Sequence, residues 1–464
     1  MIFFQSVLAF FVSLSILVNI HELGHYLVAR WCGVKVRRYS FGWGKVIYSR
    51  KFGKDQMEWA ISNLPLGGYV SWFDSSDPDT TEFTQEDVAR EFRNQSVWKR
   101  AAIVLAGPMA NFLLAIALFA GLFMHGIQEP VAKLRLTSSS SLAYQAGLRQ
   151  GDLVLEINDK KIQTWTELKW HLMKAGLSHA DPHIEVQRDN PDRPGSKIRL
   201  SVELPVKQLS AKELEGDFAG LVGLGLAVNP EVIFDEVMPD SPASKAGLLA
   251  GDQIIAVGQK PLLDVIDFIG VVNANPGKPL SLLVKRKQDR FEVDVTPVAQ
   301  QVNGKTVGQL KVKLRAVNAE IVTVQSSFFE AISKAAERVW DTSSLSLKMI
   351  GKMFTGEVSL RNISGPITIA DYAGQTSRIG AISYINFIAF VSISLGVMNL
   401  LPIPFLDGGH LLYYSLEVLT GKPLPERSIR MAQYAGGTLL LAMMGIAFFN
   451  DFARLMSYLP RLMP

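Results

Sequence analysis

The sequence has a single cysteine and few charged residues for a chain of 464. Because one cysteine can form neither an internal disulfide nor a multi-cysteine metal site, any metal bound here must use His and carboxylate ligands. Cys32 itself is expected to be a packing residue. Charged residues make up 19% of the chain and hydrophobic residues 48%, whereas soluble domains usually contain about 25% charged residues. This composition predicts a membrane protein.

The basic residues form no Lys/Arg-rich run, and the formal net charge is only +4. Nucleic acid is therefore not an expected partner. The chain has long uncharged stretches instead, each long enough to cross a lipid bilayer as a helix. They cover residues 1–20, with apolar character continuing to residue 29, and residues 101–128, 379–406 and 431–450. The first lacks the basic n-region and cleavage site of a signal peptide, so we expect a retained span.

Lys and Arg residues gather at three places beside these stretches, which marks those membrane ends as cytoplasmic. They follow the first stretch, precede the second, and lie between the third and fourth (Arg30, Lys35, Arg37, Arg38, Arg93, Lys99, Arg100, Lys422, Arg427 and Arg430). Both termini, and the long insert between the second and third stretches, are then expected on the opposite side, the periplasm of a Gram-negative cell. If the cell is Gram-negative, the pattern predicts a multi-pass protein of the bacterial inner membrane.

The insert contains an internal repeat. Residues 141–162 align without gaps with residues 241–262, at an offset of one hundred residues. Each copy has the pattern of a short helix, a Gly-Asp turn and a strand rich in Val, Ile and Leu. The two copies resemble the PDZ domains of bacterial proteases, which bind peptide C-termini or act as a size filter. The run LVGLGLAV at 221–228 is expected to form the carboxylate-binding loop of the second copy, and no equivalent is evident for the first.

Two further segments carry recognisable patterns. Residues 38–72 alternate apolar and polar residues around a Lys-Phe-Gly-Lys-Asp turn, which predicts a β-hairpin close to the membrane. Residues 328–354 show helical spacing of apolar residues, typical of an amphipathic helix on a membrane surface. The expected fold is a multi-span α-helical membrane protein with four transmembrane helices, a membrane-associated β-hairpin region and two extracytoplasmic α+β PDZ domains. Its expected divisions are the first span (1–30), the hairpin region (31–97), the second span (98–128), the two PDZ domains (129–220 and 221–312), the linker with the amphipathic helix (313–375), the third span (376–408), and a loop with the fourth span (409–464).

The first stretch ends in His21-Glu22-Leu23-Gly24-His25. On a helix, His21 and His25 lie one turn apart on the same face, so both imidazoles can reach one Zn²⁺. Zinc would lower the pKa of its water, and Glu22 would accept the proton as general base. Ionisable groups within a hydrophobic span are costly unless they are paired or functional, so polar residues at an exposed helix end are the weaker interpretation. The motif predicts a zinc hydrolase.

A catalytic zinc also needs a third protein ligand. Outside the third stretch, the remaining histidines lie at the far end of the second stretch or in the insert. The third stretch ends at two prolines, which break a helix, and is followed by Asp407 and His410 at the same cytoplasmic depth as His25. Residue chemistry favours Asp407 and leaves His410 open as a ligand or as a partner of a ligand.

These motifs, in this order, resemble the site-2 protease family of intramembrane zinc metalloproteases, and within it the bacterial type that regulates sigma E. They are HExxH in the first span, Gly107-Pro108-Met109-Ala110-Asn111 in the second, the two repeats, and Asn-x-x-Pro-x-Pro-x-Leu-Asp-Gly in the third. The resemblance covers essentially the whole chain. It implies one zinc ion held by His21, His25 and Asp407, with Glu22 as the catalytic residue and Asn399 holding substrate.

The resemblance also implies that the hairpin around Pro65, Gly67 and Gly68 lines the path to the metal, and that Gly107, Pro108 and Asn111 shape helix packing near the site. A transmembrane helix hides its peptide bonds in internal hydrogen bonds, so a protease must unwind it, and a strand edge could hold the extended segment. An ordinary turn is the alternative interpretation of the hairpin glycines.

The leading hypothesis is an endopeptidase that cuts transmembrane segments of single-span proteins in the lipid bilayer. By resemblance, its substrates would be a membrane-bound anti-sigma factor and remnant signal peptides. An inactive membrane scaffold whose PDZ domains bind peptide C-termini is the alternative, and the intact HExxH motif argues against it. A transporter is a third possibility, since intramembrane ionisable residues also mark ion paths. No inverted repeat is evident among the four spans.

Overall fold

The computed structural model describes residues 2–77, 83–190, 192–193, 195–207, 209, 218–228, 230–302, 305–315, 318–356, 358–359 and 363–458. The chain forms two compact units. The first combines Met1–Ile127 with Gln325–Ser457 and is mainly helical, whereas the second, Gln128–Val324 with Tyr458–Pro464, contains the insert.

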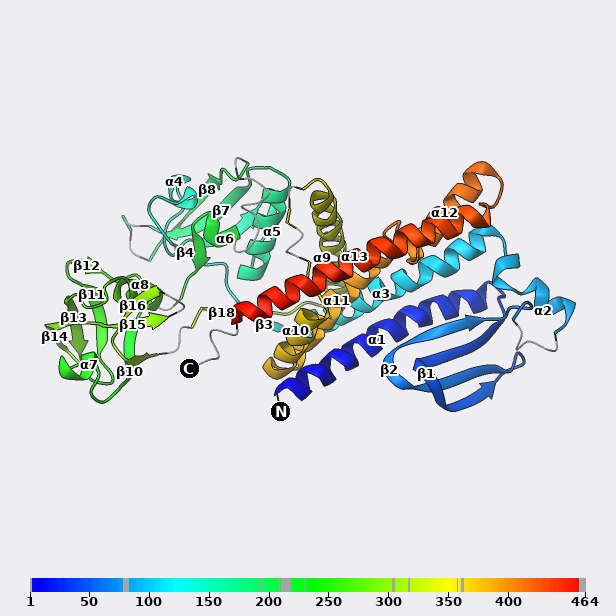
Figure 1. The fold of residues 1–464 in the computed structure, drawn as a ribbon. Coiled ribbons are helices and arrows are strands. Elements are labelled where there is room, and N and C mark those ends of the chain that lie inside the picture. Colours follow the sequence, from blue (N-terminus) through cyan, green and yellow to red (C-terminus); the bar gives the residue numbers. More distant parts are fainter. Residues whose placement is uncertain are drawn as a thin grey trace. The chain divides into compact units, whose positions relative to one another are not determined.

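Four helices among the described residues are long and apolar enough to cross a membrane, as the sequence predicted (Figure 1). They are α1 (Ile2–Trp31), α3 (Val97–His125), α11 (Ala381–Leu400) and α13 (Glu426–Tyr458). The helix of the third span ends six residues earlier than the uncharged stretch does, because Pro402 and Pro404 follow and cannot continue it. Shorter helices of this unit are α2 (Gln85–Ala89), the 3₁₀ turn η1 (Phe92–Asn94), α9 (Phe328–Phe354), α10 (Pro366–Ile379) and α12 (Asp407–Thr420).

Helices α1 and α3 pack closely because Gly24 lies at their contact. A Cβ at Gly24 would meet the Ala106 carbonyl oxygen and would lie 2.7 Å from the Ala110 Cβ. On its other side α3 forms an apolar cluster with α9 and α11, to which α9 contributes Ala331, Ala335 and Val339. Small side chains allow such close helix approach in membranes. The pair α1 and α3 forms the scaffold on which the functional residues lie.

The fourth span is the most exposed of the four. Only 17% of its apolar window is buried, compared with 33–39% for the others. Near its C-terminal end the buried Asp451 accepts hydrogen bonds from the backbone N–H groups of Gly365, Ile367 and Thr368, at 2.9–3.1 Å. These donors are the free N–H groups at the start of α10, so Asp451 acts as an N-cap supplied by another helix. It anchors α13 to α10.

Strands β1 (Val36–Phe52) and β2 (Met57–Trp72) form an antiparallel pair joined by a turn at residues 53–56. Both strands bend, so that Tyr39 pairs with both Val70 and Trp59. The first part of β1 therefore lies between two segments of β2. Tyr39 is buried, and its hydroxyl donates to the Asn19 carbonyl of α1 at 2.8 Å. This contact holds the sheet against the helix just before His21.

The insert contains two similar units that follow the sequence repeat. The first consists of β4 (Leu134–Leu136), α4 (Leu142–Gln145), β5 (Leu153–Ile157), β6 (Lys160–Lys161), α5 (Trp165–Leu177), β7 (His183–Asp189), β8 (Lys197–Glu203), α6 (Phe218–Leu221) and β9 (Leu224–Leu226). The second consists of β10 (Val232–Val237), α7 (Pro242–Lys245), β11 (Gln253–Val257), β12 (Lys260–Pro261), α8 (Val265–Ala274), β13 (Leu280–Arg286), β14 (Asp289–Val295), β15 (Val298–Val302), β16 (Lys305–Gln309) and β17 (Val312–Leu314).

Strand pairing corrects the expected boundary between the two repeats. Strand β9 pairs with β4, the first strand of the first repeat, just as β17 pairs with β10 in the second. The run at 221–228 therefore pairs within the first repeat, where β9 and β4 form a two-stranded sheet, and is not the loop of the second, so a boundary at 220/221 is wrong. The corresponding segment of the second repeat runs into β17. The sequence alone misled because the glycine-rich run adjoins the second repeat along the chain, whereas its partner strand lies ninety residues earlier.

Each repeat is stabilised by the same buried ion pair. Asp152 is fully buried and bound by the Arg188 guanidinium, and Asp252 is bound by Arg286 in the same way. Hydrogen bonding to Asp152 raises the pKa of Arg188, so the guanidinium stays charged. This duplicated detail supports the alignment of the two repeats.

The two ends of the insert lie together. Strand β3 (Ile127–Pro130) pairs with β18 (Ile321–Val324), and the Val131 N–H donates to the Glu320 carbonyl at 2.9 Å. In the helical unit, the Ser326 N–H donates to the Phe123 carbonyl at 2.9 Å. The chain thus leaves and re-enters the helical unit at one point.

Candidate active site

His21 and His25 extend from one face of α1, where four-residue spacing places them together, and both are buried. Gly107 of α3 faces them. A Cβ at this position would meet the His25 Nε2 and would lie 2.5 Å from the His25 Cε1 and 2.8 Å from the His21 Cε1. The absence of a side chain at Gly107 therefore provides the space that the two imidazoles occupy.

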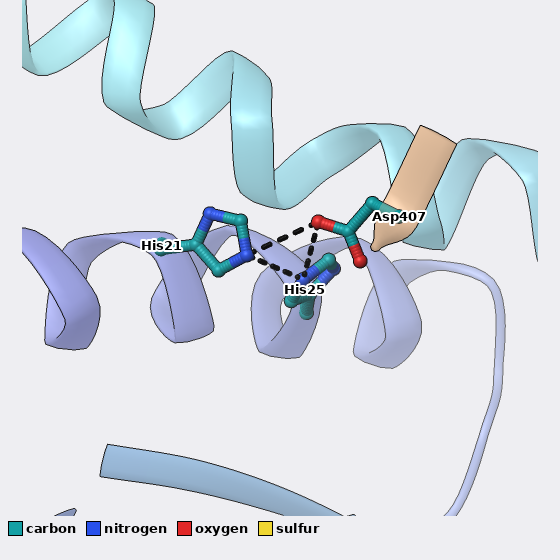
Figure 2. A group of neighbouring side chains, drawn as sticks. All are labelled: His21, His25 and Asp407. Carbon is teal, nitrogen blue, oxygen red and sulfur yellow. Dashed lines mark hydrogen bonds and ion pairs between the residues drawn. The ribbon is translucent and has the colours of Figure 1, made fainter. Parts of the chain in front are cut away.

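Asp407, the first residue of α12, completes a group of three (Figure 2). The two Nε2 atoms are 3.1 Å apart, and the Asp407 Oδ2 lies 3.1 Å from the His21 Nε2 and 3.6 Å from the His25 Nε2. Atoms bound to one zinc at 2.0–2.1 Å in tetrahedral geometry lie roughly 3.3 Å apart. The triangle has the size of one face of such a tetrahedron.

The outer nitrogens of the two imidazoles have buried partners. The His25 Nδ1–H donates to the Ile103 carbonyl of α3 at 2.8 Å, so the lone pair of the neutral imidazole is on Nε2. The His21 Nδ1 lies 3.2 Å from the Asn111 amide nitrogen, while the Asn111 Oδ1 is buried without a hydrogen-bond partner among the described residues. Rotating the amide by 180° lets Oδ1 accept from the Nδ1–H, so we assign Asn111 as the acceptor. Both Nε2 lone pairs then face Asp407.

The donor set fits a divalent cation. The Asp407 Oδ2 is buried and has no hydrogen-bond donor among the residues that the structure describes. A buried acceptor without a partner costs about 1–3 kcal/mol, and more when it is charged. Two imidazole lone pairs and a carboxylate oxygen pointing at one another are compensated by a metal ion, and this mixture of nitrogen and oxygen ligands is typical of catalytic zinc.

The turn that follows α11 places Asp407 beside the two histidines. Phe405 adopts a φ of +84°, unusual for a bulky residue, and α12 begins two residues later. Gly408 and Gly409 pack directly on the preceding turn, since a Cβ at Gly409 would lie 2.5 Å from the Ile403 carbonyl oxygen. The strained turn and the two glycines bring Asp407 back toward α1.

Glu22 lies between the metal ligands and the β-sheet. Its Oε2 accepts a hydrogen bond from the Val70 N–H of β2 at 3.1 Å. Gly68 approaches α1 so closely that a Cβ would lie 2.6 Å from the Asn19 Oδ1, and the Gly67 carbonyl accepts from the Asn19 amide at 3.1 Å. The two glycines therefore let the strand run beside α1, where its edge reaches the carboxylate expected to act as a base.

Other residues singled out from the sequence are not members of this group. Asn399 is in the last turn of α11 and has no side-chain hydrogen bond within the described part of the chain, and Pro65 is exposed in β2. His410 lies one turn beyond Asp407, with its ring 6.0 Å from that of Tyr413, and is not part of the three-residue group. The geometry thus favours Asp407 over His410 as the third ligand.

Sequence reasoning missed one contribution to this site, the Val70 N–H, and two contacts that fix the fourth span, those of Asp451 and of Gly436 with Gly437. The Val70 N–H could not be found, because backbone donors carry no sequence signature. Asp451 lies one residue beyond the uncharged stretch, and an acidic residue at that place was a usable signal. The adjacent Gly436 and Gly437 in the fourth span were a second signal, since small residues mark close helix contacts.

Replacing Gly107 by Ala is expected to weaken zinc binding by about 10- to 100-fold, since overpacking of a tight contact costs roughly 1–3 kcal/mol and the new Cβ displaces the His25 ring. Competition with a chromophoric chelator measures the affinity. Gly121→Ala in the same helix is the control, because a Cβ there meets no atom within 4 Å. Equal zinc affinity in the two variants would contradict the steric role of Gly107.

The His₂Asp group, with an adjacent Glu on a membrane-spanning helix, defines a zinc-dependent membrane hydrolase. The model of peptidase family M50 matches residues 9–443, and the chain belongs to this family. A protein of Ralstonia nicotianae whose name calls it a zinc metalloprotease is 40% identical over 97% of this chain and 98% of its own length. Regulator of sigma-E protease RseP of Escherichia coli is 35% identical over 98% and 99%. The regulator of sigma E protease of Haemophilus influenzae is 34% identical over 98% and 100%.

The prediction of a zinc metalloprotease of the site-2 family is therefore confirmed. The family and the four apolar helices also support a multi-pass protein of the inner membrane.

Proposed function

We propose that this chain is an intramembrane endopeptidase that cleaves the transmembrane segments of single-span proteins. The observation that carries the proposal is the position of the metal-binding group. His21 and His25 lie on a helix long and apolar enough to cross a membrane, and Asp407 comes seven residues after the end of another. A site assembled between such helices meets substrates that are themselves in the bilayer.

In this proposal His21, His25 and Asp407 hold one zinc ion. Zinc supplies a Lewis acid and lowers the pKa of water into the neutral range. Glu22 accepts a proton from the attacking water and returns it to the departing amine nitrogen. The Val70 N–H fixes one carboxylate oxygen of Glu22, which leaves the other free for the proton. Asn111 and Ile103 hold the two imidazoles in the tautomer that ligation requires.

The edge of β2 beside Glu22 is proposed to hold the unwound substrate by backbone pairing. A helical substrate must expose its peptide bonds before cleavage, and a strand edge replaces the lost hydrogen bonds. Pro65, Gly67 and Gly68 form the approach to this edge, and the close contact of the glycines with α1 supports the assignment. The Asn399 amide, which makes no hydrogen bond to the described residues, is proposed to hold a freed peptide group.

The two repeats of the insert are proposed to be PDZ domains on the periplasmic side, together with both termini. The closing strands β9 and β17 support this, since each leaves one edge for a peptide. In the second repeat a cavity of about 510 Å³ lies between α8 and β17, lined by Phe268, Ile269, Val272 and Leu310 among others. The cavity would select peptide C-termini, or the two domains would exclude large substrates. In both cases the domains act on the substrate before the membrane site does.

The substrates are proposed to include a membrane-bound anti-sigma factor and remnant signal peptides. The names of the relatives in Escherichia coli and Haemophilus influenzae, both regulators of sigma E, support the first of these.

Helix α9 is proposed to lie at the membrane surface. Its exposed Phe329 and Trp340 support this position.

Removal of zinc tests the proposal. Purified protein treated with a strong chelator is expected to lose cleavage of a model single-span substrate, and stoichiometric Zn²⁺ should restore it, because a metal-free His₂Asp group has no Lewis acid. Cleavage is measured by gel electrophoresis and bound zinc by atomic absorption. Undiminished cleavage by zinc-free protein would refute the mechanism. Zinc binding without cleavage of any transmembrane segment would favour the alternative of an inactive membrane scaffold that binds peptide C-termini.

A further inference from the structure

The fourth span contacts the ligand-bearing segment through two adjacent glycines. A Cβ at Gly436 of α13 would lie 2.7 Å from both the Cβ and the carbonyl oxygen of Pro404. A Cβ at Gly437 would lie 3.0 Å from the Phe405 ring. Carbon atoms normally pack at about 3.5–4.0 Å. Any larger residue at Gly436 must therefore push Pro404 and its backbone away.

Pro404 is enclosed from the other side as well. A Cβ at Gly409 of α12 would lie 2.8 Å from the Pro404 Cα. Pro404 is thus packed between α13 and the first turn of α12, with a glycine at each contact. A movement of α13 at Gly436 is transmitted through Pro404 to the turn that carries Asp407.

The segment between Pro404 and Asp407 is short and strained. Phe405 has a φ of +84° and a largely exposed side chain, so burial of its own ring does not hold it in this conformation. The Leu406 N–H donates to the Ile403 carbonyl at 3.0 Å, which makes residues 403–406 a hydrogen-bonded turn. Such a turn shifts as a unit. Asp407 begins at its end, with its carboxylate about one zinc-ligand spacing from both histidines.

We propose that Gly436 and Gly437 are positioning residues for Asp407, so that the zinc site depends on a span that contributes no ligand. This inference rests on the proposed role of Asp407 and extends it. The fourth span is the least buried of the four, and it sets the ligand geometry through one close contact. Its displacement would therefore change the metal site directly.

Alanine substitutions in the full-length protein test this. Gly436→Ala is expected to weaken zinc binding about tenfold and to alter the d–d absorption of the Co²⁺-substituted protein, which reports ligand geometry. Gly437→Ala should have a smaller effect, because the Phe405 ring can turn aside. Gly445→Ala is the matched control in the same helix, since a Cβ there meets no atom within 4 Å. Thermal unfolding of the metal-free proteins separates loss of fold from loss of ligand geometry.

Zinc affinity and a cobalt spectrum in Gly436→Ala equal to those of Gly445→Ala would overturn the inference. If Gly436→Ala does not fold, the zinc affinity of Gly437→Ala tests the inference in its place. Weaker zinc binding that is restored by adding Phe405→Ala supports the positioning role, and unchanged binding contradicts it. A wild-type protein without zinc or cleavage would instead indicate failure of the proposed function, so the two failures are distinguishable.

Discussion

Replacement of Glu22 by Gln is expected to lower the rate of substrate cleavage by about 10²- to 10⁴-fold, the usual contribution of a general acid–base group. Glutamine keeps the size of the side chain and can still contact the Val70 N–H, but it cannot accept a proton at neutral pH. Glu22 is not one of the three converging ligands. The amount of bound zinc should therefore remain that of the wild-type protein.

Two measurements check this expectation together. The cleavage rate of a model single-span substrate gives the loss of catalysis, and atomic absorption gives the zinc content. Glu426→Gln is a suitable control, since its carboxylate is exposed at the start of α13. A Glu22→Gln variant that cleaves at the wild-type rate would exclude Glu22 as the base. Loss of zinc in this variant would show that Glu22 holds the metal instead.

Replacement of Asp407 by Asn is expected to weaken zinc binding strongly. Loss of a hydrogen-bond partner of a metal ligand already lowers metal affinity by roughly 10- to 100-fold, and loss of the ligand itself should cost more. Asparagine preserves the shape of the side chain but removes its negative charge, and two neutral imidazoles alone hold zinc poorly. Cleavage should fall together with zinc occupancy and should recover in part at high zinc concentration. Competition with a chelator measures the affinity.

His410→Asn serves as the comparison for this prediction. Its ring stands beside Tyr413 and Tyr414, outside the three-residue group. This variant should retain the zinc affinity of the wild-type protein. If the His410 variant lost zinc while Asp407→Asn kept it, the third ligand would have to be reassigned to His410.

The four apolar helices, and the pairing of His21 with His25 on one helix face, could be predicted from sequence because both depend on local patterns. An uncharged run of about twenty residues has few folded alternatives to a membrane helix. His21 and His25 share a helix face by spacing alone. Asp407 was harder, since it lies far from them along the chain. Residue chemistry left it in competition with His410, and packing of the helices brings Asp407 to the histidines.

Features that depend on pairing between distant segments could not be predicted. The glycine-rich run at 221–228 looks like the start of the second repeat, yet β9 pairs with β4 of the first. Which strands pair depends on the whole fold of the repeat. Proximity along the sequence therefore does not show which strand β9 pairs with. The contact of Gly436 with Pro404 is similar, because a glycine in a span shows that something packs closely without showing what.

The joined ends of the insert have a consequence for how such a chain can be rebuilt. Strand β3 leaves the helical unit beside the point where β18 returns, with Phe123 bound to Ser326 at the junction. A segment attached in this way is an exchangeable insertion, because another domain whose termini lie close together can take its place without separating α3 from α9. Gene-level exchange at this junction is thus a simple route by which a membrane enzyme acquires a new domain or loses one.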